Sequence, residues 1–342
     1  MKFDFIIGNP PYQDETENKG DRANPLYDKF MDSAYSLSEI VMLIHPARFL
    51  FNAGQTAKSW NDKMLKDEHF KVIEYEPIAN KIFPNTDIKG GVVISIRNLN
   101  ITYGAIRKFI PQQELKNIVK KVSIVTDTYL DSIIASRGMY RFSEKFYADY
   151  PQALEMVGSG TGNMVVSNIF EKMGEVFHNT PCSEASSQIA ITGRIKNRRE
   201  RRYIKSEYIL PNEFLNKYNV MVAKSSGTGR FGEVFGVPFI LAPREGATDT
   251  YISIGFLETE NEAEALSKYL KTKFFRAMLG VNKVTQDNPK QVWSSIPLQN
   301  FTPDSDIDWT ASIPDIDKQL YAKYGLDETE IEFIETHVKE MQ

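Results

Sequence analysis

A short rigid segment near the N-terminus, Asn9-Pro10-Pro11-Tyr12, restricts what the chain can fold into. It follows residues 2–8, a mainly apolar run of strand length that ends in a glycine. Because each proline fixes φ and lacks a backbone N–H, the segment can neither continue a strand nor begin a regular helical turn. The sequence therefore predicts a buried parallel strand over residues 2–8, followed by a stiff loop that presents an amide and a phenol.

Asn-Pro-Pro-Tyr after an apolar strand ending in Gly resembles motif IV of the amino-group methyltransferases that use S-adenosylmethionine. The resemblance implies that the Asn9 side-chain oxygen and the Pro10 carbonyl accept hydrogen bonds from an exocyclic amino group. It also implies that Tyr12 stacks on a planar base, with Pro11 keeping the loop rigid. Such groups orient an amine toward a methyl donor and hold a base that has left its stack. The alternative is an ordinary proline-rich turn.

Two further segments extend this resemblance. Residues 45–50, His-Pro-Ala-Arg-Phe-Leu, resemble motif VI, a strand end followed by a turn, and His45 is interpreted as structural. Residues 83–91 lead from Phe-Pro to Gly-Gly before an apolar strand and resemble motif VIII, which implies that Phe83 helps to enclose the flipped base. A simple β-hairpin is the alternative for this second segment, and the family sheet also carries an antiparallel edge strand.

Periodicity places regular elements around these motifs. A polar loop over residues 13–23 precedes helices predicted over 25–37 and 56–68 and strands over 39–44, 70–76 and 92–97. This order resembles the second half of a Rossmann-like methyltransferase sheet. Only eight residues precede Asn9, whereas related enzymes carry the Gly-rich motif I upstream. We therefore expect that the upstream half is a separate chain or has been removed, and that the S-adenosylmethionine site is incomplete. This chain alone should bind the cofactor weakly or not at all, and it should be inactive as a methyltransferase.

The Gly-rich loop at residues 158–162 is the candidate that could replace motif I. A nucleotide-binding loop should follow an apolar strand and open a helix. Residues 148–155 are instead polar and interrupted by a proline. A linker loop is the favoured interpretation, and the cofactor-binding residues stay unknown.

The composition excludes several classes of site. The 342 residues carry a net charge of −4, so nucleic-acid binding requires a local basic patch. The one cysteine, Cys182, excludes a disulfide framework and is interpreted as a small filler residue. The four histidines are too scattered to suggest a metal site. With no signal peptide and no apolar run near ~18 residues, we expect a cytoplasmic protein without membrane contact.

Basic residues gather in the second half of the chain. Residues 194–203 hold six basic side chains against one acid, and residues 224–232 form a second, Gly-rich basic loop. Neutralisation of DNA phosphates is the direct interpretation, and a solvated charged turn is the alternative. The predicted DNA-binding residues are Arg194, Lys196, Arg198, Arg199, Arg201, Arg202, Lys224 and Arg230, together with Lys283 and Gln286 from a later loop.

The later loop belongs to a pattern of about 80 residues that ends near residue 302. Strands are predicted at 218–223 and 251–256. A helix over 261–279, a polar loop at 280–287 and a strand at 292–298 follow, and their order resembles target-recognition domains of restriction-modification enzymes, including type I specificity subunits. The alternative for the loop is an exposed helix-to-strand connection. The acidic tail over residues 304–342 is predicted to be helical and to contact protein rather than phosphate.

These observations together predict an α/β protein with a partial Rossmann-like sheet, an α+β target-recognition domain and a helical tail. The expected domains are 1–120, 121–180 as a linker, 181–302 and 303–342. The resemblance implies an adenine-N6 DNA methyltransferase acting on duplex DNA with a flipped adenine, with an upstream half, a nuclease or a helicase region as possible partners. The alternatives are a non-catalytic DNA specificity module, or a methyltransferase for RNA guanine N2 or protein glutamine.

Overall fold

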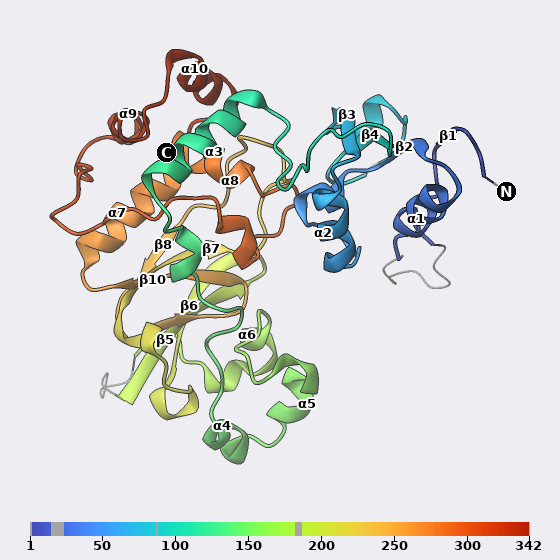
Figure 1. Cartoon of the computed structure of the whole chain (residues 1–342). Helices are drawn as coiled ribbons and strands as arrows, with labels where there is room; N and C mark the ends of the chain where they lie inside the picture. The colour runs from blue at the N-terminus through green and yellow to red at the C-terminus, as the bar shows by residue number, and fades with distance from the viewer. Residues whose placement is uncertain (1, 15–23, 87, 182–186, 342) are drawn as a thin grey trace. The chain divides into compact units, whose positions relative to one another are not determined.

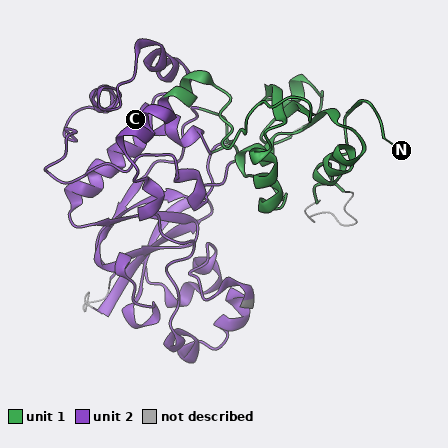
Figure 2. Cartoon of the chain, viewed as in Figure 1, with its two compact units in different colours: residues 1–117, 228–231, 283–285 green, residues 118–227, 232–282, 286–342 purple. Residues whose placement is uncertain are grey.

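A computed structural model describes residues 2–14, 24–86, 88–181 and 187–341. Most of the loop predicted at 13–23, and Cys182, lie outside the described residues. The chain forms two compact units, shown in Figure 2: unit 1 comprises residues 1–117, 228–231 and 283–285, and unit 2 comprises the remainder. No helix in the described ranges is long and apolar enough to cross a membrane.

Unit 1 contains a mixed sheet of four strands (Figure 1). The strands are β1 (Ile6–Gly8), β2 (Ile40–Pro46), β3 (Phe70–Glu76) and β4 (Val92–Asn98), in the order β1-β2-β4-β3. β1 runs parallel to β2, whereas β4 is antiparallel to both β2 and β3. The antiparallel strand β4 is therefore internal, and it pairs with β3, the strand that precedes it in the chain.

Two helices build the core of unit 1 with one face of this sheet. α1 (Tyr27–Leu37) and α2 (Lys58–Lys66) bury Met31 and Met64, which join Leu43 of β2 and Phe49 of the following 3-10 helix in one hydrophobic core. Burial alternates along β2, with Val41, Leu43 and His45 inside, as expected for a strand with one covered face.

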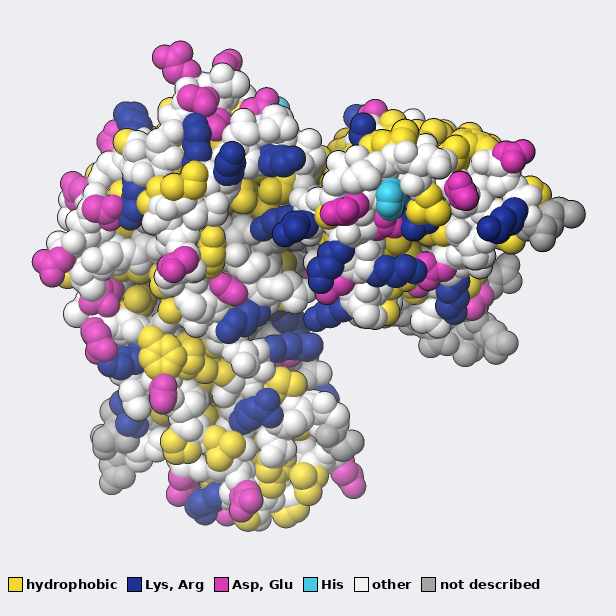
Figure 3. Space-filling view, viewed as in Figure 1, with side chains coloured by type: hydrophobic (Ala, Val, Ile, Leu, Met, Phe, Trp, Pro, Cys, Tyr) yellow, Lys and Arg dark blue, Asp and Glu magenta, His cyan; other side chains and the backbone are white. Residues whose placement is uncertain are grey.

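β1 is parallel as predicted but is not buried, which corrects the sequence-based expectation. Ile7 is 71% exposed and Phe5 is 46% exposed. The reason is that β1 is an edge strand, paired with β2 on one side only. An apolar run of strand length does not distinguish a central strand from an edge strand. Figure 3 shows a band of apolar side chains on the drawn face of unit 1.

Unit 2 contains two three-stranded sheets. The first has the order β6-β5-β9, and the second has the order β10-β7-β8. The strands are β5 (Gln188–Ile195), β6 (Arg198–Lys205), β7 (Tyr218–Ala223), β8 (Phe239–Leu241), β9 (Glu245–Ala247) and β10 (Tyr251–Leu257). The helices before β5 are α3 (Gln113–Val125), which crosses the boundary between the units, α4 (Glu144–Asp149), α5 (Ala153–Val157) and α6 (Ile169–Lys172).

Two elements predicted in this region differ in the structure. The single helix expected over 261–279 is two helices, α7 (Glu260–Lys271) and α8 (Lys273–Gly280). Thr272 is extended, with ψ 152°, and its hydroxyl accepts a hydrogen bond from the backbone N–H of Phe275 at 3.1 Å, so it caps α8. The strand expected over 292–298 is a 3-10 turn and coil, in which buried Trp293 and Ile296 account for the apolar pattern.

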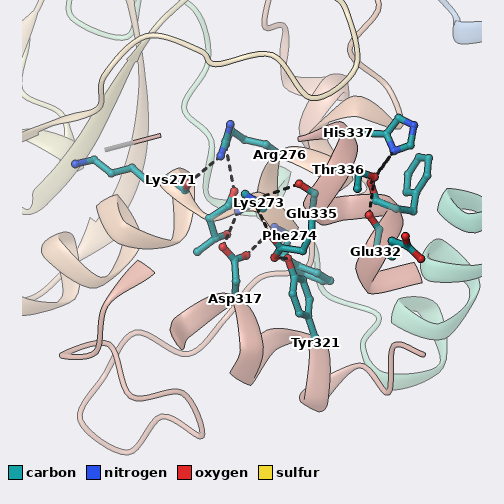
Figure 4. Close-up of polar contacts among 12 residues, drawn as sticks. Lys271, Lys273, Phe274, Arg276, Asp317, Tyr321, Glu332, Glu335, Thr336 and His337 are labelled. Atoms are coloured by element: carbon teal, nitrogen blue, oxygen red, sulfur yellow. Dashed lines mark hydrogen bonds and ion pairs between the residues drawn. The ribbon is translucent and has the colours of Figure 1, made fainter. Parts of the chain in front are cut away.

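The tail forms α9 (Ile313–Lys323) and α10 (Glu328–His337), as its periodicity predicted. Figure 4 shows how both helices meet α8. The buried Asp317 carboxylate accepts hydrogen bonds from the backbone N–H groups of Lys273 and Phe274, at 3.0 and 2.8 Å. Glu335 of α10 pairs with the Lys273 ammonium group and accepts a hydrogen bond from Tyr321. Burial raises the pKa of Asp317 to about 6.

The α/β class is therefore confirmed, with mixed sheets and helices in both units. The Rossmann-like and target-recognition assignments, and the functional labels of the four expected domains, stay predictions.

Candidate functional site

A cavity of about 470 Å³ lies in unit 1, beside the C-terminal end of β1. Three predicted site residues line it: Asn9 and Tyr12 come from one loop, and Phe83 comes from a segment far away in the sequence. The lining residues are Asn9, Tyr12, Gln13, Pro25, Tyr27, Pro46, Arg48, Gly54, Gln55, Phe83, Thr86 and Ile88. This volume falls within the range of about 300–1,000 Å³ typical of small-molecule sites.

The loop after β1 supplies one wall of the cavity. Asn9 and Pro11 are exposed, Pro10 is buried and Tyr12 is half-buried. The Tyr12 hydroxyl is buried, and no hydrogen-bond partner for it is found among the described residues. Burial raises the pKa of Tyr12 to about 12, so this phenol is neutral at physiological pH. The wall therefore offers an accessible amide and a neutral ring.

Phe83 supplies a second aromatic surface. It follows a 3-10 turn, Ala79–Lys81, and lines the same cavity as Tyr12. The centroids of the two rings lie 6.2 Å apart and their planes are inclined by 72°. The structure thus brings Phe83 to the Asn9–Tyr12 loop, in an edge-on arrangement.

His45 packs against Tyr27, one of the residues that line the cavity. It is fully buried, and its ring lies parallel to that of Tyr27 with the centroids 6.0 Å apart. Nε2 lies 2.7 Å from the Ser95 hydroxyl and Nδ1 lies 3.1 Å from the Pro46 carbonyl, so Nδ1 carries the proton and Nε2 accepts. Burial lowers the pKa of His45 to about 4, which keeps the imidazole neutral. This geometry agrees with the structural interpretation of His45.

Sequence reasoning assigned no role to Tyr27, Arg48 or Gln55, which also line the cavity. Arg48 follows β2 in the Pro-containing turn, and Tyr27 begins α1. The local signal was their position at the ends of predicted elements, because loops at strand ends commonly carry functional side chains.

The predicted basic run forms the hairpin of β5 and β6. Lys196 and Asn197 make its two-residue turn, with positive φ values of 47° and 64°. Arg194 lies directly opposite Arg199 across the hairpin. Because side chains alternate along a strand, Arg194, Arg199 and Arg201 share one face, whereas Arg198 and Arg202 lie on the other. The run is therefore divided between two surfaces.

Most of these arginines have contacts within unit 2. The Arg199 guanidinium lies 3.9 Å from the Phe239 ring centroid, and that of Arg194 lies 5.8 Å from the Tyr251 ring centroid. Arg201 pairs with Glu245, and Arg202 lies 3.7 Å from Glu200.

The remaining predicted DNA contacts are distributed differently. Lys224 pairs with Asp249 at 3.0 Å, and Gln286 is exposed in unit 2. Arg230 is exposed and belongs with Lys283 to unit 1. Lys283 is only 5% exposed and its ammonium group donates to the Thr285 carbonyl, so its position does not favour a phosphate contact.

Comparisons with known proteins address the N-terminal segment. Residues 1–83 match the Eco57I restriction-modification methylase family. A Mycoplasma pneumoniae protein described as an uncharacterized adenine-specific methylase is 34% identical over 95 residues. Residues 1–83 are therefore related to restriction-modification methylases.

The methylase similarity covers part of the chain only. The Mycoplasma match spans 27% of this chain and 22% of that protein. The type IIG restriction endonuclease BpuSI is a structural neighbour at 8% identity, covering 91% of this chain and 49% of that one. Its TM-score of 0.30 supports no conclusion about this chain. Of the residues that the structure describes, no group of His, Cys, Asp and Glu could hold a metal ion.

Proposed function

We propose that this relative of restriction-modification methylases acts in site-specific methylation of DNA at adenine N6, with S-adenosylmethionine as the methyl donor. The observation that carries the proposal is the meeting of Asn9, Tyr12 and Phe83 around one open cavity. A proline-rich turn with a purely structural role does not require an accessible amide beside a cavity of this size.

The chemistry of the cavity suits an extruded purine. The Asn9 side-chain oxygen and the Pro10 carbonyl accept hydrogen bonds from the N6 amino group, and they orient its lone pair toward the donor. Tyr12 contacts one side of the base and Phe83 limits its movement on another. No catalytic base is required, because the two acceptors localise the lone pair of the amine and the sulfonium group of the methyl donor would supply the driving force. The N6 proton that the methyl group replaces would pass to solvent.

The Gly-rich loop that the sequence offers as a replacement for motif I does not fit the methyl donor. The loop at residues 158–162 follows helix α5 in unit 2 rather than a strand, so it lacks the geometry of a nucleotide-binding loop. We propose that the donor site is completed by a segment that pairs with the open edge of β1. The exposed Ile7 and Phe5 support this, because an apolar edge strand is normally covered or paired.

The hairpin of unit 2 is our candidate for DNA contact. Arg194 and Arg199 lie directly opposite each other, and like charges in such a pair repel. A bound phosphate would relieve that repulsion, which supports a role in contacting the DNA backbone. We assign unit 2 to target recognition on this basis, with duplex DNA as the partner and a nuclease or helicase region as a further component of the complete system.

The proposal can be tested in the native host, whatever the length of the complete protein. Changing the Asn9 codon to Ala should remove N6-methyladenine from one DNA sequence motif, detected by single-molecule sequencing. The matched Asn100→Ala change, at an exposed residue of unit 1 outside the cavity, should leave methylation intact. Unchanged methylation in the Asn9→Ala strain would exclude the proposed role.

A further inference from the structure

Arg48 places a positive charge at the wall of the cavity. Among the described residues that line the cavity, Arg48 is the only one with a charged side chain, and the others are polar, aromatic or aliphatic. Burial raises the pKa of Tyr27 to about 12, the Thr56 side chain lowers it, and the charges of Asp28 and Arg48 act on it in opposite directions, so both charges lie near this phenol. A cation beside an otherwise uncharged wall favours a ligand that carries a negative group.

The Arg48 side chain is held in a defined position. Its Nε donates a hydrogen bond to the Lys89 carbonyl at 2.6 Å. Gly54 and Gly90 lie against its stem, and a Cβ at either position would lie 3.3 or 3.0 Å from a side-chain carbon of Arg48. Both glycines have positive φ values, 95° and 84°, so a side chain there would also strain the backbone. The two glycines therefore leave room for the arginine stem.

The bond to Lys89 occupies Nε, and a guanidinium group carries further N–H donors on its outer nitrogens. Such a planar group recognises phosphate with two parallel hydrogen bonds. Because the stem is fixed, little conformational entropy is lost when a phosphate binds. The cavity volume of about 470 Å³ also allows more than a flat base to be bound.

We propose that Arg48 binds a phosphate group of the flipped nucleotide, and so acts as a positioning residue that sets the distance between the base and Asn9. This inference rests on the proposed function, because it assumes that the base enters the same cavity. Phosphate binding by Arg48 makes the site selective for a nucleotide. The contacts to the amino group alone would accept any planar molecule that carries such a group.

The test is a titration of the full chain with deoxyadenosine and with its 5′- and 3′-monophosphates, followed by ligand-observed NMR. The wild-type chain should bind one monophosphate roughly tenfold more tightly than the nucleoside, the effect of one charged hydrogen-bonding pair. Arg48→Gln should remove this difference between the monophosphate and the nucleoside. Arg48→Lys should restore part of it, and the control Lys29→Gln, at an exposed residue of α1, should keep all of it.

The outcomes separate the two proposals. Equal binding of nucleoside and both monophosphates by the wild type, or an unchanged preference in Arg48→Gln, overturns the role of Arg48 alone. Deoxyadenosine binding that does not respond to Asn9→Ala overturns the proposed function instead. Failure of all three ligands to bind overturns both.

Discussion

The ring of Tyr12 meets the ring of Phe83 edge-on, with the centroids 6.2 Å apart. Tyr12 follows the edge strand β1, whereas Phe83 comes from the connection between β3 and β4. The contact joins two segments that were identified separately from the sequence, and both rings line the cavity beside Asn9.

Replacing Tyr12 with Ala should weaken binding of deoxyadenosine, because stacking of a base on an aromatic side chain contributes about 1–3 kcal/mol. We expect a loss of roughly tenfold or more in affinity, measured by titration of the full chain. Tyr12→Phe should bind nearly as well as the wild type, since it keeps the ring and its hydroxyl has no partner among the described residues. Equal binding by Tyr12→Ala and the wild type would remove Tyr12 from the site.

Unit 1 should lose stability in acid because of His45. Its pKa is lowered to about 4 in the folded chain, compared with 6.5 in the unfolded chain. A buried neutral imidazole therefore contributes stability that is present above pH 6.5 and is lost as the pH falls toward 4, on the order of 3 kcal/mol in total. Hydrogen exchange of β2 amides measures this loss for unit 1 itself. His45→Gln should show a flatter dependence over that range, and an identical profile would contradict the assignment.

The arginine face of the hairpin should control the salt dependence of DNA binding. We expect the double change Arg194→Ala and Arg199→Ala to lower affinity and to reduce the slope of log K against log salt by about 0.9 for each phosphate that is no longer neutralised. The control pair, Lys145→Ala and Lys318→Ala, removes the same charge from exposed helical positions of unit 2. An equal effect of both pairs would indicate a general charge effect rather than a defined interaction with the DNA backbone.

Local patterns predicted many elements correctly. The strands over residues 70–76 and 218–223 have the predicted bounds, because each is a short segment rich in β-branched and aromatic residues. The prediction of one helix over 261–279 was wrong, because the helix is interrupted at Thr272, whose hydroxyl caps the next helix. The burial of β1 was also wrong, because sheet position depends on pairing between distant strands.

The site was predictable only where a motif marked it. The sequence indicated the Asn9–Tyr12 loop and Phe83, and the structure places them at one cavity. Arg48 lies in the segment that resembles motif VI, but the sequence assigned it no role, because its position at the cavity depends on Gly54 and Gly90, which approach it from two other loops. The division of the basic run into two faces likewise follows from the strand pairing of β5 and β6, which a count of charges does not contain.

The most direct test of the central claim compares deoxyadenosine with purine deoxyriboside, which lacks the 6-amino group. The wild-type chain should bind deoxyadenosine roughly tenfold more tightly, because two acceptors at Asn9 and Pro10 hold the amine. Asn9→Ala should lose most of this preference while its affinity for purine deoxyriboside stays the same. A preference of undiminished size in Asn9→Ala, or no preference in the wild type, would contradict recognition of the exocyclic amine at this loop.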